Sequence, residues 1–508
     1  MKTAGQTRRA IAAGETTAAA EAAACLQRIE AHDGALNAFT QVLADRAMAR
    51  AEAVDARLKA GETIDAVGPL AGVPIAVKDN ICTDFGRTTC ASRMLESYES
   101  PFSATAVEKL EAAGAVIVGK TNLDEFAMGS SGEFSAAGAT RNPWDTSRVP
   151  GGSSSGSAAA VAAGLVPVAL GSDTGGSVRQ PAALTGTVGF KPTYGTVSRW
   201  GLVAFGSSLD QIGPIARSVE DAALVFDVIS GRDPRDATCL DRDPARTAGG
   251  VGQPLDGFSI AVPTLARSDS IDAHVRLVFG MACRVLEDLG AEFHEVTLPP
   301  VEQMLAAYYT VAPAEASSNL ARYDGIRYGR RAEIGPGEGL DGLYVRSRSE
   351  GFGPEVQRRI LLGTHVLRAG YADRYYQRAL QLRRLIRSDF DAVFGPMACD
   401  AVLTPTTPHP AFALGEKLVE TTGDCASMYL EDTLTVAANL AGLPAVSVPA
   451  GFVPAGEPGR EASLPVGIQL IGPALGETRL LRLAASFERA AGFGGRVAPG
   501  FMPDKAGG

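Results

Sequence analysis

The sequence predicts an α/β fold with a mixed central sheet, because short apolar segments alternate with amphipathic ones along most of the chain. Between about 300 and 397 the strand-like segments fade and apolar residues recur at helical spacing. We therefore expect a helical insertion there. No repeat of fixed period interrupts the pattern, so we predict one domain over 1–491, followed by a loose tail rich in Gly and Pro over 492–508.

Local signals place the individual elements in order. Thr16 or Thr17 is a suitable N-cap for the first helix, Gly61 ends the second, and Gly114 is a suitable C-cap between a helix and a buried strand. Helices are predicted over 16–31, 38–60, 104–113, 153–163, 218–230, 272–289, 304–323, 354–394 and 477–491. Strands are predicted over 72–80, 115–119, 166–170, 212–216, 259–263, 292–296, 401–403, 445–449 and 466–471.

Composition excludes several classes of protein. A net charge of −10 without a dense basic run argues against a surface that supplies most of the contacts to a nucleic acid. The seven cysteines are scattered and never form a CxxC pair, so we expect reduced thiols and no metal site. The N-terminal segment lacks the apolar core of a secretion signal, and no uncharged apolar run approaches 18 residues. These features predict a cytoplasmic protein that does not enter the membrane.

Two clusters of glycine and serine, Gly151–Gly156 and Gly171–Ser177, flank an Ala- and Val-rich segment. The second cluster follows the strand predicted over 166–170, and its glycine pair lets successive backbone amides point to one side. A phosphate-binding loop would have Lys directly after the glycines, and none is present. Such amides suit the oxyanion of an acyl transfer, where each well-placed donor lowers the barrier by about 2.7–4 kcal/mol. Ser177 is then the candidate nucleophile.

A serine nucleophile needs a base, and Lys78 is the candidate. It closes the apolar stretch Val73–Val77, and loss of solvent lowers the pKa of a lysine toward neutrality. On position alone, a strand-end lysine that reaches solvent is the commoner case. None of the five histidines stands in a recognisable catalytic context; they are His32, His274, His294, His365 and His409.

The first cluster has two simpler interpretations. Ser153–Ser155 could be an ordinary helix cap, which is far commoner than a catalytic serine. Gly152–Gly156 also satisfies the GxSxG pattern with Ser154 at its centre, but that pattern needs a preceding apolar strand, which is missing here.

Taken together, the runs GGSSSGSAAAVAAG and GSDTGGSVRQPA, with Lys78 in GVPIAVKDN, resemble the amidase signature family. The 24-residue spacing between Ser153 and Ser177 agrees with that family. The resemblance implies the amidase-signature fold, a mixed central sheet covered by helices on both faces, with its signature core over 65–230.

The same resemblance implies a Ser–cis-Ser–Lys triad. Ser177 would be the nucleophile, Ser153 the bridging serine that follows a cis peptide, and Lys78 the terminal base. Ser155 departs from the glycine that the family commonly has, and the small added side chain is not expected to disable the site. The backbone amides implied as the oxyanion hole are those of Thr174, Gly175, Gly176 and Ser177.

Further segments resemble one branch of the family, the glutaminase subunits of tRNA-dependent amidotransferases. They are NLDEFAMGSSGE (122–133), TRNPWD (140–145), KPTYGTVSRWGLVAFGSSLDQIGPIAR (191–217), EASSNLARYDGIRYG (315–329), SRSEGFGPEVQRRILLGT (347–364) and NLAGLPAVSVPAGF (439–452). The resemblance implies that this chain hydrolyses glutamine and sends the ammonia to a B subunit. There, with ATP and Mg²⁺, a misacylated Glu-tRNA(Gln) or Asp-tRNA(Asn) would be amidated. A small C subunit would complete a heterotrimer, and this chain itself would need no cofactor.

Free glutamine is a zwitterion, so its site needs a cation and an anion. By resemblance, Arg359 would bind the α-carboxylate and Asp432 the α-ammonium, with Tyr308 close by. The neighbouring Arg358 and Tyr309 leave the choice within each pair open.

Two alternatives remain open. A stand-alone amidase acting on small or aryl amides would share the triad without needing the charged pair. A non-catalytic assembly subunit would use the glycine clusters only for close packing, although the intact Lys78, Ser153 and Ser177 argue against it.

Overall fold

The structure, a computed structural model, describes residues 2–253, 255, 257–455 and 463–501. Within these residues a single sheet of 11 strands runs through the molecule in the order β1-β3-β2-β4-β6-β5-β10-β11-β9-β7-β8. The strands are β1 (Phe39–Val42), β2 (Pro74–Lys78), β3 (Val116–Thr121), β4 (Val168–Asp173), β5 (Val188–Lys191), β6 (Gln211–Ala216), β7 (Phe258–Pro263), β8 (Ala291–Val296), β9 (Ala401–Pro405), β10 (Ala445–Pro454) and β11 (Ser463–Ile471).

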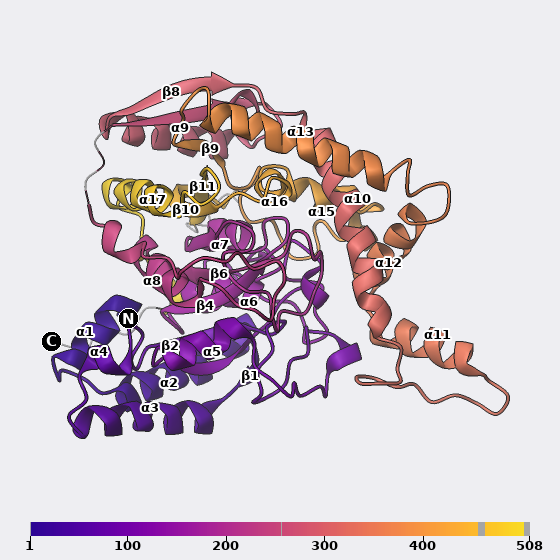
Figure 1. The fold of residues 1–508 in the computed structure, drawn as a ribbon, viewed down its shortest axis with the longest axis horizontal. Helices are drawn as coiled ribbons and strands as arrows, with labels where there is room; N and C mark the ends of the chain where they lie inside the picture. The colour runs from indigo at the N-terminus through magenta and orange to yellow at the C-terminus, as the bar shows by residue number, and fades with distance from the viewer. Residues whose placement is uncertain (1, 254, 256, 456–462, 502–508) are drawn as a thin grey trace.

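The sheet is mixed, as predicted. Strands β3, β2 and β4 run parallel to one another, and so do β9, β7 and β8 at the other end. The strands between them pair antiparallel, from β4 through β6, β5, β10 and β11 to β9. In Figure 1 the labelled strands follow this order from β1 in the lower part of the picture to β8 at the top.

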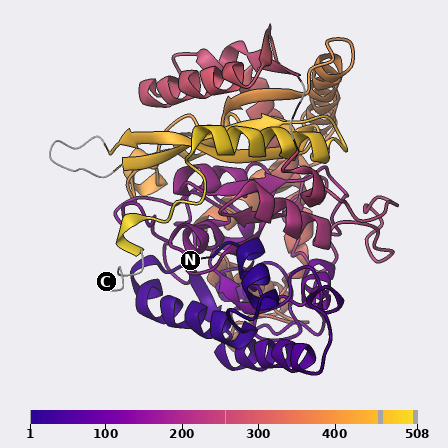
Figure 2. The ribbon, with the colours of Figure 1, turned by 90° about the vertical axis from the view of Figure 1, so that its left-hand side faces the viewer.

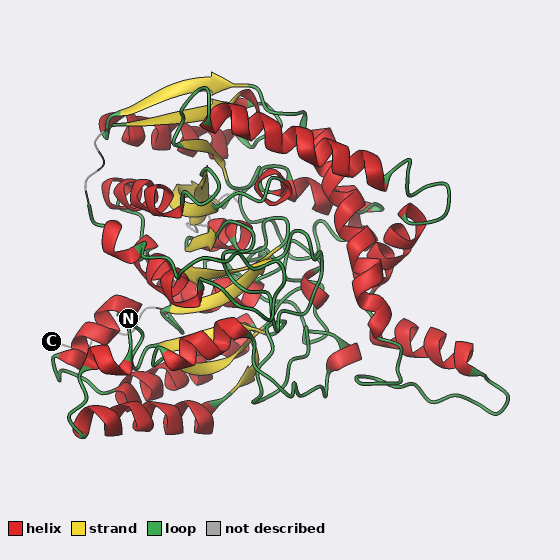
Figure 3. Cartoon of the chain, viewed as in Figure 1, coloured by secondary structure: helices red, strands yellow, loops and turns green. Residues whose placement is uncertain are grey.

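Helices cover both faces of the sheet (Figure 3). They are α1 (Ala4–Ala12), α2 (Ala18–Leu36), α3 (Ala44–Lys59), α4 (Ile64–Val67), α5 (Thr105–Ala112), α6 (Ser155–Ala162), α7 (Arg179–Thr185), α8 (Val219–Ile229), α9 (Ala273–Asp288), α10 (Val301–Asn319), α11 (Leu340–Gly351), α12 (Pro354–Val366), α13 (Tyr376–Phe394), α14 (Val419–Thr422), α15 (Ala426–Tyr429), α16 (Val436–Leu440) and α17 (Glu477–Ala491). Among the helices of the described ranges, none combines the length and the apolar character of a membrane span.

Alternation along β2 explains why both faces are buried. Ile75 and Val77 point into a core that includes residues of α5, α8, α9 and α17, whereas Ala76 points into a core with α2, α3 and α6. A strand that is buried on both sides carries an almost continuous apolar sequence, which is what residues 73–77 show. In Figure 2, α17 lies across the strands of the C-terminal part of the sheet.

The predicted helical insertion is present as α10 to α13, of which α10, α12 and α13 share a separate apolar core with α16 and the loop around Phe205. Helix α10 packs against both α12 and α13, and α11 projects at the edge of the molecule (Figure 1). The continuous helix predicted over 354–394 is instead two helices, because the chain turns through 367–375, where Gly370 has φ +79°.

Other predicted boundaries differ as well. The helix predicted over 38–60 begins as the four-residue edge strand β1, which pairs with β3 before α3 starts. Strand β5 and helices α1, α4, α7, α11, α14, α15 and α16 were not predicted. Of the predicted tail, residues 492–501 are described, and the Ala498 amide donates to the Ala162 carbonyl at 3.0 Å. Residues 502–508 lie outside the described residues.

Candidate active site

Lys78 lies at the end of β2 with its side chain fully buried. Its Nζ atom lies 2.8 Å from the Ser153 Oγ and 3.0 Å from the hydroxyl oxygens of Ser154 and Ser172. Burial lowers the pKa of Lys78 to about 7, although nearby carboxylates, led by Asp124, act to raise it. A large share of the amine is therefore neutral near pH 7, and a neutral amine accepts a proton from a hydroxyl.

Ser153 follows a cis peptide bond with Gly152. Position 152 has no space for a side chain, because an added Cβ atom would lie 2.0 Å from the Asp124 Oδ2. The Gly152 amide donates to the Gln180 side chain at 2.8 Å, and the Asp124 amide donates to the Ser153 carbonyl at 3.3 Å. Contacts on both sides of the bond thus hold the Ser153 hydroxyl beside the amine.

The two glycine and serine clusters meet directly. Helix α6 and strand β4 turn the chain back, and the Ser154 amide donates to the Ser177 carbonyl at 3.1 Å. Ser177 lies in the turn between β4 and α7 and is 7% exposed, whereas Lys78 and Ser153 are 0% exposed. Among the three predicted triad residues, Ser177 is therefore the one that a substrate can reach.

The predicted oxyanion hole needs one correction. The Gly176 amide donates to the Asp173 Oδ1 at 2.9 Å, so it is already engaged within the turn. Gly176 has φ +144°, and an added Cβ atom would lie 2.4 Å from the Thr435 hydroxyl. In the described part of the chain, the amides of Thr174, Gly175 and Ser177 donate no hydrogen bond and remain available.

A buried ion pair, to which sequence reasoning assigned no role, holds this turn in place. Arg179 donates from Nε and Nη2 to the two carboxylate oxygens of Asp173, at 3.0 and 2.9 Å. Burial acts to raise the pKa of Asp173, but the adjacent guanidinium outweighs it and lowers that pKa to about 2. Arg179 also donates to the Thr435 carbonyl at 3.0 Å and to Asn439. The available signal was an Asp and an Arg close together in an otherwise uncharged stretch.

Asp432, the predicted anion of the glutamine site, is buried between two hydroxyl groups. Tyr309 donates to its Oδ2 at 2.6 Å and Ser130 to its Oδ1 at 2.8 Å. Burial raises the pKa of Asp432 to about 6, and these hydrogen bonds limit the rise. The carboxyl group is therefore mostly ionised above pH 7.

Arg359, the predicted cation, lies on α12 and is buried. Its Nε donates to the Glu355 Oε1 at 2.7 Å, and its guanidinium carbon lies 5.6 Å from the centre of the Tyr309 ring. Arg358 also pairs with Glu355, but its side chain is 31% exposed against 3% for Arg359. Of the two adjacent arginines, Arg359 faces inward, toward the tyrosine that binds Asp432.

The two adjacent tyrosines of α10 contact different parts of the site. Tyr308 packs on the turn that carries Ser177, since a Cβ atom added at Gly175 would lie 2.5 Å from its hydroxyl oxygen. Tyr309 instead binds Asp432. The structure thus brings a buried amine–hydroxyl pair, a serine turn, a buried anion and a buried cation to one region of the molecule.

Comparison with known proteins identifies the family. The sequence model of the Amidase family matches residues 21–481. The chain belongs to the amidase family.

Relatives of this amidase chain include amidotransferase subunits and a peptide amidase. It is 55% identical to the A subunit of the glutamyl-tRNA(Gln) amidotransferase of Symbiobacterium thermophilum over 490 residues, which is 96% of each chain. The crystal structure of the corresponding protein from Thermotoga maritima, which has the same name, is 45% identical, with a TM-score of 0.73, and the match covers 93% of this chain and 91% of that one. The peptide amidase of Stenotrophomonas maltophilia is 31% identical, with a TM-score of 0.82 and coverage of 99% of both chains. The predicted amidase-signature fold is confirmed. Sequence identity to the two amidotransferase subunits is higher than to the peptide amidase.

Proposed function

We propose that this chain is the glutaminase subunit of a tRNA-dependent amidotransferase, a carbon–nitrogen ligase that uses glutamine as its amide donor. The observation that carries the proposal is the 2.8 Å contact between the buried Lys78 amine and the Ser153 hydroxyl, set beside a buried Asp432 and Arg359. The first feature supports amide hydrolysis. The second supports a substrate that carries both an ammonium and a carboxylate.

In the proposed reaction, neutral Lys78 takes the proton of Ser153 while Ser153 takes that of Ser177. The Ser177 Oγ attacks the side-chain amide carbon of glutamine, and the available backbone amides of its turn stabilise the oxyanion. The relay returns the proton to the leaving nitrogen, which departs as ammonia. Water then hydrolyses the γ-glutamyl ester by the same relay, which releases glutamate and restores Ser177.

Glutamine selection follows from the charged pair. Arg359 would bind the α-carboxylate through its two Nη atoms, since its Nε is occupied by Glu355. Asp432 would bind the α-ammonium. Tyr308, which packs on Gly175, would line the space between these groups and the nucleophile.

The remaining components are proposed from the names of the relatives. A protein named as one lettered subunit of an amidotransferase implies partner subunits, and we propose that B and C subunits complete a cytoplasmic heterotrimer. The B subunit would bind misacylated tRNA and use ATP and Mg²⁺ to attach the ammonia, and this chain would need no cofactor. The net charge of −10 supports this division of roles.

The deciding experiment is to co-express the chain with candidate B and C subunits and to measure glutamine-dependent amidation of Glu-tRNA(Gln) and Asp-tRNA(Asn). We expect amidation that requires all subunits, glutamine and ATP. A stand-alone amidase would instead be fully active alone on small or aryl amides and indifferent to substitution of Arg359 or Asp432. A non-catalytic assembly subunit would not react with a fluorophosphonate at Ser177.

A further inference from the structure

The proposed cation and anion of the glutamine site are joined by a continuous chain of buried and half-buried side-chain contacts. Glu355 precedes Arg359 by one turn of α12 and is 3% exposed. Its Oε1 accepts from the Arg359 Nε at 2.7 Å and from the Tyr429 hydroxyl at 2.9 Å. One carboxylate oxygen therefore links α12 to the segment that carries Asp432.

The chain continues through two aromatic rings. Tyr429 stacks on Tyr309, with ring centres 4.0 Å apart and planes at 20°. The Tyr309 hydroxyl then donates to the Asp432 Oδ2 at 2.6 Å. A change in the position of Glu355 would thus move both Arg359 and, through the stacked rings, Asp432.

Glu355 fixes the Nε edge of the Arg359 guanidinium. The guanidinium carbon of Arg359 lies 5.3 to 5.6 Å from the centres of three rings, those of Phe205, Tyr309 and Tyr429. Rings attract a cation but do not bind a particular N–H group. Within the described residues, Glu355 is the acceptor of the one hydrogen bond that Arg359 donates, and Nη1 and Nη2 donate none. The Nε edge is held back, and the two Nη groups remain for a carboxylate.

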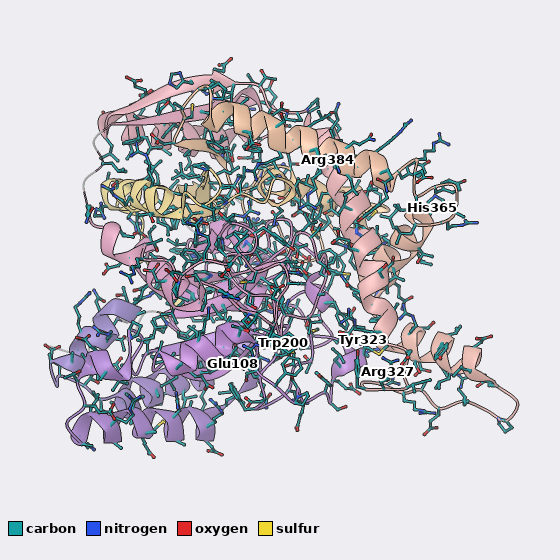
Figure 4. All side chains as sticks on the ribbon, in the orientation of Figure 1. Glu108, Trp200, Tyr323, Arg327, His365 and Arg384 are labelled. Atoms are coloured by element: carbon teal, nitrogen blue, oxygen red, sulfur yellow. The ribbon has the colours of Figure 1, made fainter. Side chains whose placement is uncertain are left out.

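Only one face of α12 takes part in these contacts. His365, on the same helix, lies exposed at the outer edge of the molecule (Figure 4). Arg358 binds Glu355 from the partly exposed side, so Glu355 retains one cation even if Arg359 is removed. An ion pair needed only for folding would affect every reaction of the enzyme equally.

We propose that Glu355 is a positioning residue that sets substrate selectivity. It orients Arg359 directly, and it orients Asp432 through Tyr429 and Tyr309. The site thereby becomes selective for an amide that carries both an α-ammonium and an α-carboxylate. This inference rests on the proposed glutaminase function and deepens it. Glu355 touches neither the nucleophile nor the reacting amide.

The test compares two reactions of the full-length chain in complex with its partner subunits. The first is ammonia release from glutamine, measured as kcat and KM. The second is the rate at which a small fluorophosphonate labels Ser177, which requires the triad but no amino-acid recognition. In Glu355→Gln we expect the KM for glutamine to rise about 10-fold or more, with the labelling rate within about twofold of the wild type.

Two further variants sharpen the test. Tyr429→Phe removes the hydroxyl that binds Glu355 but keeps the stacked ring, so we expect a smaller rise in KM, about threefold, again with unchanged labelling. Because Glu355 stays in place, this variant remains informative if Glu355→Gln does not fold. Glu350→Gln is the matched control, since Glu350, on the preceding helix α11, forms an exposed ion pair with Arg330 and should change neither reaction.

The outcomes separate the two proposals. If Glu355→Gln and Tyr429→Phe leave the KM for glutamine unchanged, or slow ammonia release and labelling to the same extent, the positioning role is wrong and the proposed function stands. If the wild-type complex labels at Ser177 but releases no ammonia from glutamine, the proposed function fails and the inference fails with it.

Discussion

The proposed catalytic and recognition halves of the site are built in different ways. Lys78, Ser153 and Ser177 belong to strands and tight turns of the sheet, where added Cβ atoms at Gly152 or Gly176 would clash. The recognition residues lie on the insertion helices and on the segment before α16, and they are joined by side-chain contacts. In the half built from tight backbone turns, few substitutions fit without a clash. In the other half, single side chains on helices can be substituted without changing the backbone. This fits a family that includes both amidotransferase subunits and a peptide amidase.

The largest effect should come from the catalytic half. Ser177→Ala removes the nucleophile, and we expect glutamine hydrolysis to fall at least ~10⁴-fold with the thermal unfolding temperature unchanged within about 2 °C. Ammonia release and thermal unfolding monitored by circular dichroism would check this. Ser154→Ala is the matched control: Ser154 also contacts Lys78 but bears no reacting atom, so a much smaller loss is expected. Equal losses in the two variants would contradict the assignment of Ser177.

Lys78→Met should lower kcat about 10³-fold, because the relay loses its final proton acceptor. In the wild type, kcat/KM should rise with pH through about 7, since burial brings the pKa of Lys78 to about 7 and only the neutral amine accepts a proton. A profile of kcat/KM between pH 5 and 9 would test both statements. A flat profile through pH 7 in the wild type would exclude Lys78 as the titrating base.

Arg359→Gln tests the recognition half. We expect the KM for glutamine to rise about 100-fold, because the α-carboxylate loses its charged partner, while the rate of fluorophosphonate labelling at Ser177 stays within about threefold. Arg358→Gln serves as control, since its side chain is partly exposed and should change KM only slightly. A larger effect at position 358 than at position 359 would reverse the assignment.

The smallest effect concerns the pH response of the recognition half. The carboxyl group of Asp432, with its pKa raised by burial to about 6, must be ionised to bind an ammonium. Below pH 6, kcat/KM should therefore depend on the ionisation of both Lys78 and Asp432 and fall up to ~100-fold per pH unit. In Asp432→Asn the fall should be ~10-fold per unit, on a lower baseline. Circular dichroism over the same pH range separates this response from unfolding.

The sequence predicted most of the catalytic half and less of the recognition half. Apolar strands that end in a charged residue, as at Lys78, and paired glycines before Ser177 carry local signals of burial and turn geometry. Resemblance supplied Ser153, Arg359 and Asp432. Sequence alone could not choose between Tyr308 and Tyr309, because tertiary packing decides which ring meets Gly175 and which meets Asp432. Each of these contacts joins residues far apart in the chain.

The same limits apply to the fold. Strand β1 is four residues long and continues almost directly into α3. The helical pattern of residues 38–60 as a whole therefore hid the short strand at their start. The break after α12 has one clear signal, Gly370, within a region of otherwise helical composition. The ion pair between Glu355 and Arg359 did have a local signal in the sequence, which the prediction did not use. An acidic residue four positions before an arginine on a helix can form an i,i+4 pair.

The contacts of Arg179 bear on when activity can first arise during synthesis of the chain. Its guanidinium binds Asp173 nearby, but it also binds Asn439, 260 residues later, and Gln469, 290 residues later. Gln469 lies in β11, which emerges from the ribosome last among the described strands. We therefore expect the turn that carries Ser177 to reach its final geometry only when translation is nearly finished, because these long-range contacts close late. A nascent or truncated chain that ends before β11 should consequently release no ammonia.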